Sequence, residues 1–189
     1  MLDVLVGAAD RARGLPYVWG ATADEHAREY PADTQLSGPV RRLTRAVTVR
    51  APAALTYRWL CQVSVAPYSY DWVDNFGRRS PQQVTPGADE LYVGQSMMVF
   101  RLVDVTPGRQ FTGRGLTAAE RLFGPLAGTY AVEPVDTHSS RLVCRLVIAD
   151  PTGLGRVRAT ALAWGDALMM RKQLLNLGRL AERDAARGS

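Results

Sequence analysis

The densest group of polar aromatic residues lies just after the first predicted helix, where Tyr68, Tyr70, Asp71 and Trp72 follow one another closely. Two phenols and a carboxylate near the mouth of a pocket can orient a ligand or transfer a proton. The alternative is structural: Trp72 and one tyrosine fill the junction between helix and sheet, while Asp71 caps a helix or pairs with Arg78. The residue types alone leave both interpretations open.

Four arginines on predicted strands form a second group of candidates: Arg101, Arg114, Arg141 and Arg145. An inward-facing arginine can bind a carboxylate or an enolate, because its planar guanidinium pairs with two oxygens. In an alternating strand, however, the charged residue usually faces away from the core. Arg101 and Arg145 fall opposite the apolar positions of their strands, so the pattern favours an outward orientation.

The remaining reactive side chains predict neither a metal centre nor a known catalytic motif. Cys61 and Cys144 are 83 positions apart, and Cys144 falls on an apolar strand face, which indicates an inert core thiol. His26 and His138 are too few and too distant to build a metal site, and His138 falls in a predicted exposed turn. No nucleophile elbow, phosphate loop or dinucleotide fingerprint is present. We therefore expect no cofactor and no metal.

The composition is that of a soluble globular chain. Of 189 residues, 47% are apolar and 22% charged, which excludes disorder and lets the chain form a core without disulfides. The net charge of +5 comes from scattered arginines without interleaved aromatics, so nucleic-acid binding is not expected. The longest charge-free stretch, residues 59–70, is too short to span a membrane, and the amino terminus does not resemble a signal peptide. We expect a cytoplasmic protein.

The elements that must position these residues begin at residue 41. Alternation predicts a strand over residues 41–50, and Pro52 opens a helix that Pro67 ends, with a second short helix over residues 70–77. Strands follow over residues 94–105, 109–116, 128–135 and 140–149, with a turn at residues 106–109 and a hairpin turn at residues 136–139. Residues 41–187 are predicted to form one domain, and residues 1–40 are predicted to be a helical extension that packs on it. In this extension we expect a short apolar helix before Gly14 and a second helix that begins with a capping box from Thr22 to Glu25.

One long helix is predicted over residues 153–187, which contain no proline. Its predicted inner face carries Leu154, Val157, Ala161, Trp164, Leu168 and Leu175. Trp164, Leu168 and Met169 are the helix residues expected to line any space between this helix and the sheet. The order of elements predicts an α+β fold in which a curved antiparallel sheet wraps around the long helix.

Several strings resemble the START-related helix-grip superfamily, also known as SRPBCC or polyketide cyclase/dehydrase and lipid transport-like. They are TRAVTVRAPAALTYRWLCQVS from Thr44, PYSYDWVDNFGRR from Pro67, SSRLVCRLVIA from Ser139 and MMRKQLLNLGRLAER from Met169. The WGATADEH stretch from Trp19 is similar to the lead-in of a bacterial branch. The resemblance covers residues 17–184 and implies a mostly apolar pocket between sheet and long helix. It does not specify a function, because the superfamily hosts many activities.

The first functional hypothesis is a protein, monomeric or homodimeric, that binds a small hydrophobic or aromatic molecule in that pocket. The second is a cofactor-independent cyclase or dehydratase acting on a polyketide-like or terpenoid-like substrate, whose catalysis depends on orientation. A structural or partner-binding domain is the third. The residues expected around the ligand are Tyr68, Tyr70, Trp72, Phe100, Tyr130, Trp164 and Leu168.

Overall fold

A computed structural model describes residues 14–70, 72, 77–150 and 155–188. At its centre is a seven-stranded sheet in the order β1-β2-β7-β6-β5-β4-β3. The strands are β1 (Val18–Trp19), β2 (Val40–Val49), β3 (Ser96–Met97), β4 (Phe100–Thr106), β5 (Gln110–Gly115), β6 (Leu126–Pro134) and β7 (Ser140–Ala149). Neighbouring strands are antiparallel, except that the short edge strand β1 runs parallel to β2.

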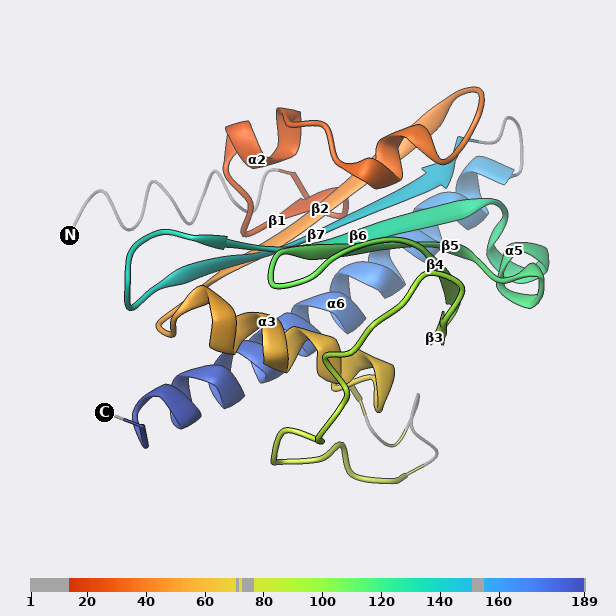
Figure 1. The fold of residues 1–189 in the computed structure, drawn as a ribbon. Helices are drawn as coiled ribbons and strands as arrows, with labels where there is room; N and C mark the ends of the chain where they lie inside the picture. The colour runs from red at the N-terminus through yellow and green to blue at the C-terminus, as the bar shows by residue number, and fades with distance from the viewer. Residues whose placement is uncertain (1–13, 71, 73–76, 151–154, 189) are drawn as a thin grey trace.

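The long helix α6 (Gly155–Ala185) crosses one face of the curved sheet, and α3 (Ala53–Cys61) with its continuation η2 (Gln62–Ser64) packs beside it (Figure 1). The short elements α2 (Ala23–Ala27) and η1 (Pro31–Thr34) cover the opposite face, and α5 (Thr117–Phe123) joins β5 to β6. The helix-grip fold expected from the sequence is confirmed. Within the described part of the chain, no helix has the length and apolar character needed to cross a bilayer.

Strand β7 shows why the alternation predicts the sheet correctly. Leu142, Cys144 and Leu146 are buried against the helices, while Arg141 and Arg145 point to the opposite face, as expected. The expected exposure of Arg145 is wrong, because residues 14–40 cover that face and its side chain is fully buried. Arg101 and Arg114 are exposed.

The covering segment binds the arginines of β7 through backbone and carboxylate oxygens. Arg145 Nη2 donates hydrogen bonds to the carbonyl oxygens of His26 (2.6 Å) and Arg28 (2.9 Å). Arg141 donates two bonds of 2.7 Å to the carboxylate of Glu25, whose helix begins with the predicted Thr22 capping box. Sheet and extension are thus joined by buried polar contacts, and the domain boundary at residue 40 stays a prediction.

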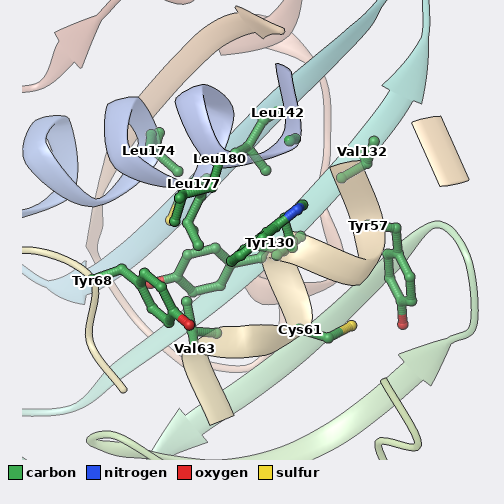
Figure 2. Packing of buried hydrophobic residues seen from close by; sticks show 14 of the residues in the cluster. Tyr57, Cys61, Val63, Tyr68, Tyr130, Val132, Leu142, Leu174, Leu177 and Leu180 are labelled. Carbon is green, nitrogen blue, oxygen red and sulfur yellow. The ribbon is translucent and has the colours of Figure 1, made fainter. Parts of the chain in front are cut away.

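The main core fills the space between the sheet, α3 and α6. Leu174, Leu177 and Leu180 reach from α6 toward the sheet residues Tyr130 and Leu142 (Figure 2). A second apolar cluster lies nearer the amino-terminal end of α6 and includes Leu43, Phe100, Leu126, Leu146, Ile148, Ala159 and Ala163. The cavity described below takes its wall from members of both clusters.

Three local predictions need comment. The single strand expected over residues 94–105 is instead β3 and β4, separated by a two-residue turn in which Met98 has φ of 51°. Helix α5 was not expected, because its seven residues give too short a pattern to recognise. The second short helix over residues 70–77 and the apolar helix before Gly14 fall largely or wholly outside the described residues.

Candidate ligand-binding cavity

A cavity of about 860 Å³ lies between the sheet and the amino-terminal two thirds of α6. This volume is within the range of pockets that hold small organic molecules. The sheet contributes Phe100, Leu126, Gly128, Tyr130, Cys144 and Leu146, and α6 contributes Leu162, Gly165, Asp166, Met169, Met170 and Gln173. The remaining wall comes from Val63, Ser64, Val65, Ala66, Pro67, Ser69, Met98, Val99 and Phe123. Most of these side chains are apolar.

Two glycines allow the ring of Phe100 to lie across the neighbouring strands. A Cβ on Gly113 would come within 2.5 Å of the Phe100 Cβ, and one on Gly128 would lie 3.3 Å from the tip of its ring. Only residues without a side chain permit this close approach. The sequence of β5 and β6 therefore sets the position of the Phe100 ring in the cavity wall.

An acid–base pair interrupts the apolar wall. Asp166 projects from α6, and its Oδ2 accepts a hydrogen bond of 2.9 Å from Nη2 of Arg45 on β2. Arg45 is buried and also donates 2.6 Å bonds to the carbonyl oxygens of Pro16 and Tyr17. Of the described lining residues, Asp166 alone carries a charged side chain. Asp166 thus gives the mostly apolar wall one charged position, which Arg45 contacts from behind.

Burial raises the pKa of Asp166 to about 6, although the Arg45 guanidinium partly opposes this shift. Burial also holds the pKa values of Tyr130 and Cys144 above their ordinary ranges, so both stay neutral. Among these three titratable lining groups, Asp166 therefore has the pKa nearest to neutral pH, which suits it to proton transfer.

Hydrogen bonds from α6 fix the segment that closes the cavity beside η2. The Tyr130 hydroxyl donates to Oε1 of Gln173 (3.0 Å), and Nε2 of Gln173 donates to the Pro67 carbonyl oxygen (2.5 Å). One turn further along, Asn176 Nδ2 donates to the carbonyl oxygen of Tyr68 (2.9 Å). The sheet, the long helix and the closing segment are thus coupled by polar side chains at one end of the cavity.

Among the expected ligand-binding residues, Phe100 and Tyr130 line the cavity. Tyr68 lies in the core beside it, with its ring edge-on to Trp59, while its neighbours Pro67 and Ser69 line the wall. Tyr70 is half-buried and Trp72 is 79% exposed, and neither belongs to the lining. A role for Tyr68, Tyr70 and Trp72 in binding stays a prediction.

The expectation that Trp164 and Leu168 face the sheet is wrong, because their side chains are 48% and 59% exposed and lie outside the lining. The face of α6 toward the sheet instead carries Ala159, Ala163 and Ala167 in its first half. Small residues there let the helix approach the sheet closely. The larger side chains on the outer face give a stronger periodic signal, so the sequence pattern predicts that this face, rather than the alanine face, packs on the sheet.

Arg45 and Asp166 were missed, although the sequence holds a signal for each. In the alternation of β2, Arg45 lies between Leu43 and Val47 on the side of the strand that faces the core. Asp166 is the only acidic residue between Asp150 and Glu182, within an otherwise apolar and basic stretch. A charged residue at a position where the pattern expects an apolar one indicates a buried ion pair or a functional site. The described residues contain no group of three histidine, cysteine or acidic side chains able to hold a metal ion.

No family model and no curated protein sequence matches the chain. Among solved structures, protein MLL2253 from Mesorhizobium loti is 16% identical over 76% of this chain and 98% of its own, with a TM-score of 0.48. The Zhui aromatase/cyclase from Streptomyces sp. R1128 is 18% identical over 80% and 99%, with a TM-score of 0.45. The di-domain aromatase/cyclase BexL is 17% identical over 75% of this chain and 46% of its own, with a TM-score of 0.49.

These similarities are too distant to carry an argument about activity, so the class rests on the topology and the cavity themselves. The sheet order, the long carboxy-terminal helix and the mostly apolar cavity between them define a helix-grip protein. The helix-grip fold that the resemblance implies is thus confirmed by the topology of the chain itself.

Proposed function

We propose that the protein binds a small apolar or aromatic molecule in the cavity between the sheet and α6. The observation that carries this proposal is a volume of about 860 Å³ within a mostly apolar lining. Such a lining gains free energy when a ligand displaces water from it, at about 25 cal/mol for each Å² of apolar surface. Asp166, held by Arg45, is a polar position in this wall and favours a molecule that carries a polar group.

Fluorescence titration with N-phenyl-1-naphthylamine, a neutral aromatic probe, tests this proposal. Leu162→Trp places a larger ring in the cavity wall and should weaken probe binding about tenfold or more. Val135→Trp is the matched control, because Val135 is exposed in the β6–β7 hairpin and far from the lining. Equal probe affinity in both variants and the wild type would remove the support for binding in this cavity.

A second function, cyclisation or dehydration of a polyketide-like or terpenoid-like substrate, is favoured by Asp166. A carboxylate whose pKa is about 6, in a mostly apolar cavity wall, can accept a proton from carbon next to a carbonyl and return it. Arg45 would hold the ionised form in place. The apolar wall would fold the substrate, so that orientation supplies much of the rate.

Exchange of the α-protons of 2-tetralone in D₂O, followed by NMR, tests this activity without the unknown substrate. Displacement of the naphthylamine probe first establishes that the ketone enters the cavity. The wild type should accelerate exchange by about 100-fold or more over buffer, and Asp166→Asn should lose this acceleration. A bound ketone that exchanges at the buffer rate would leave binding as the function.

A further inference from the structure

The outer face of α6 exposes four large apolar side chains that neither the cavity nor the core uses. Val157 is 70% exposed, Trp164 48%, Leu168 59% and Leu175 42%. Their spacings of seven, four and seven residues place them along one side of the helix, with the exposed Ala161 between them. We call these five residues the α6 seam. Exposed apolar patches of this extent mark interaction surfaces.

The spacing of the seam is the same when read in either direction. Val157 and Leu175 lie nine residues before and after position 166, and Trp164 and Leu168 lie two before and after it. In two identical antiparallel helices related by a two-fold axis at that level, Val157 faces Leu175 and Trp164 faces Leu168. Each large apolar side chain of the seam then meets another large apolar side chain.

Two charged residues beside the seam, Arg171 and Lys172, are compatible with that register. Antiparallel pairing sets Arg171 opposite Ala161 and Lys172 opposite Thr160, so neither cation meets a like charge. The Arg171 guanidinium stacks 5.5 Å from the ring centre of Trp19, which holds its charge at the flank of the seam. A parallel pair would instead set each cation against its own copy, at a cost in repulsion.

We propose that the protein is a homodimer formed by antiparallel packing of the α6 seam against the same seam of a second copy. The four large side chains expose roughly 400 Å² per copy, so covering them completely removes about 800 Å² from water in the dimer, at the low end of the sizes of protein interfaces. The mirror-symmetric spacing singles out a second copy as the partner. The seam lies on the side of α6 away from the cavity lining, so both cavities stay open in the dimer.

Sedimentation equilibrium of the full chain tests the dimer. The wild type should sediment as a dimer at micromolar concentrations. Leu168→Glu should raise the dissociation constant of the dimer about 100-fold, because a two-fold symmetric interface contains residue 168 of both copies and therefore two new charges. Val135→Glu introduces the same charge at an equally exposed apolar residue elsewhere and should leave the dimer intact. Circular dichroism checks that each variant is folded. A monomeric wild type, or a folded Leu168→Glu variant that still dimerises, would overturn the proposal.

Disulfide cross-linking tests the register. Val157→Cys and Leu175→Cys are about 27 Å apart along the helix, so neither variant alone can cross-link across an antiparallel pair. Mixing the two variants under mild oxidation should give a covalent dimer, whereas each alone should not. The native Cys61 and Cys144 are buried and supply the background control. Cross-linking of each variant with itself, or none in the mixture, would reject the antiparallel arrangement.

Discussion

Arg45 and Asp166 meet between β2 and α6 beside the cavity, with Nη2 of the arginine 2.9 Å from Oδ2 of the aspartate, although 121 positions separate them in the chain. The pair ties β2 to the middle of α6 and carries the charge in the described part of the lining. Since the guanidinium is also bound by the carbonyl oxygens of Pro16 and Tyr17, its position does not depend on the aspartate alone. Asp166 is therefore free to change its protonation state while Arg45 stays in place.

Asp166 should titrate near pH 6, which carbon-13 NMR of the side-chain carboxyl can measure. Its folded pKa of about 6 lies above the unfolded value of about 3.9, so the folded state holds this proton more tightly. The resulting stabilisation is complete below pH 4 and is lost as the pH rises through 6. Arg45 is the charged group that faces it, because the neighbouring Tyr130 and Cys144 are neutral.

Asp166→Asn should remove this contribution, worth about 2 kcal/mol, from the pH dependence of the free energy of unfolding. Urea denaturation of both proteins at pH 4.5 and 7.5 measures it. A carboxyl signal that titrates below pH 4 would contradict the assignment.

Tyr130→Phe should lower the free energy of unfolding by about 1–2 kcal/mol, because Oε1 of the buried Gln173 loses its donor. The ring itself should keep its place, stacked 5.3 Å from the ring of Phe111. Tyr92→Phe is the control, since Tyr92 is exposed, and it should change stability by less than about 0.5 kcal/mol. Urea denaturation at pH 7 compares the two. An equal effect from both variants would mean that the Gln173 contact contributes nothing.

Gly113→Ala and Gly165→Ala should shift the melting temperature in opposite directions. The new Cβ at residue 113 would collide with the Phe100 side chain and should cost about 1–3 kcal/mol. At residue 165 nothing lies within 4 Å, and alanine should stabilise α6 by about 0.5–1 kcal/mol. Differential scanning calorimetry measures both. Probe binding should also weaken in Gly113→Ala, because Phe100 must move in the cavity wall.

Glu25→Gln should destabilise the attachment of the extension by about 2 kcal/mol at pH 7, because it breaks a buried pair with Arg141. Burial opposes ionisation of Glu25, but the hydrogen bonds from Arg141 and the Thr22 amide outweigh it and keep the pKa below its ordinary value. A lowered pKa gives stability that is present above the unfolded pKa and is lost as the pH falls through the folded one.

The difference between wild type and Glu25→Gln should therefore shrink at pH 3. Asp24→Asn, a change at the exposed neighbour, should have little effect at either pH. Chemical denaturation at both pH values measures the effect, and a difference that persists at pH 3 would show that charge is not its source.

Much of the fold could be predicted from sequence because its signals are local. The alternation in β7, the proline before α3, the Thr22 capping box and the turn at Gly108, whose φ is 76°, each act over a few residues. The two-residue strand β1 gave no such signal, and its pairing with β2 depends on a tertiary contact.

The cavity was predicted less well because its walls depend on how α6 is rotated about its axis. Both sides of the helix carry apolar residues, alanines toward the sheet and larger side chains outward, so periodicity alone selected the larger set that includes Trp164. The Asp166–Arg45 pair joins elements distant in sequence, and neither residue belongs to a motif. Phe100 and Tyr130 do line the cavity, while their role in ligand binding stays a prediction, because alternation alone does not tell which face of the sheet the long helix covers.

The position of β7 and β3 within the sheet sets how fast their amide protons exchange with solvent. Backbone groups of β7 pair with β2 and β6, and apolar layers cover both of its faces, so its amides should exchange only when the whole domain unfolds. Strand β3 pairs with β4 alone, and its turn at Met98 and Val99 is part of the cavity rim. Its amides should exchange through a local opening of lower free energy. We expect the same local opening to widen the rim of the cavity while the centre of the sheet stays folded.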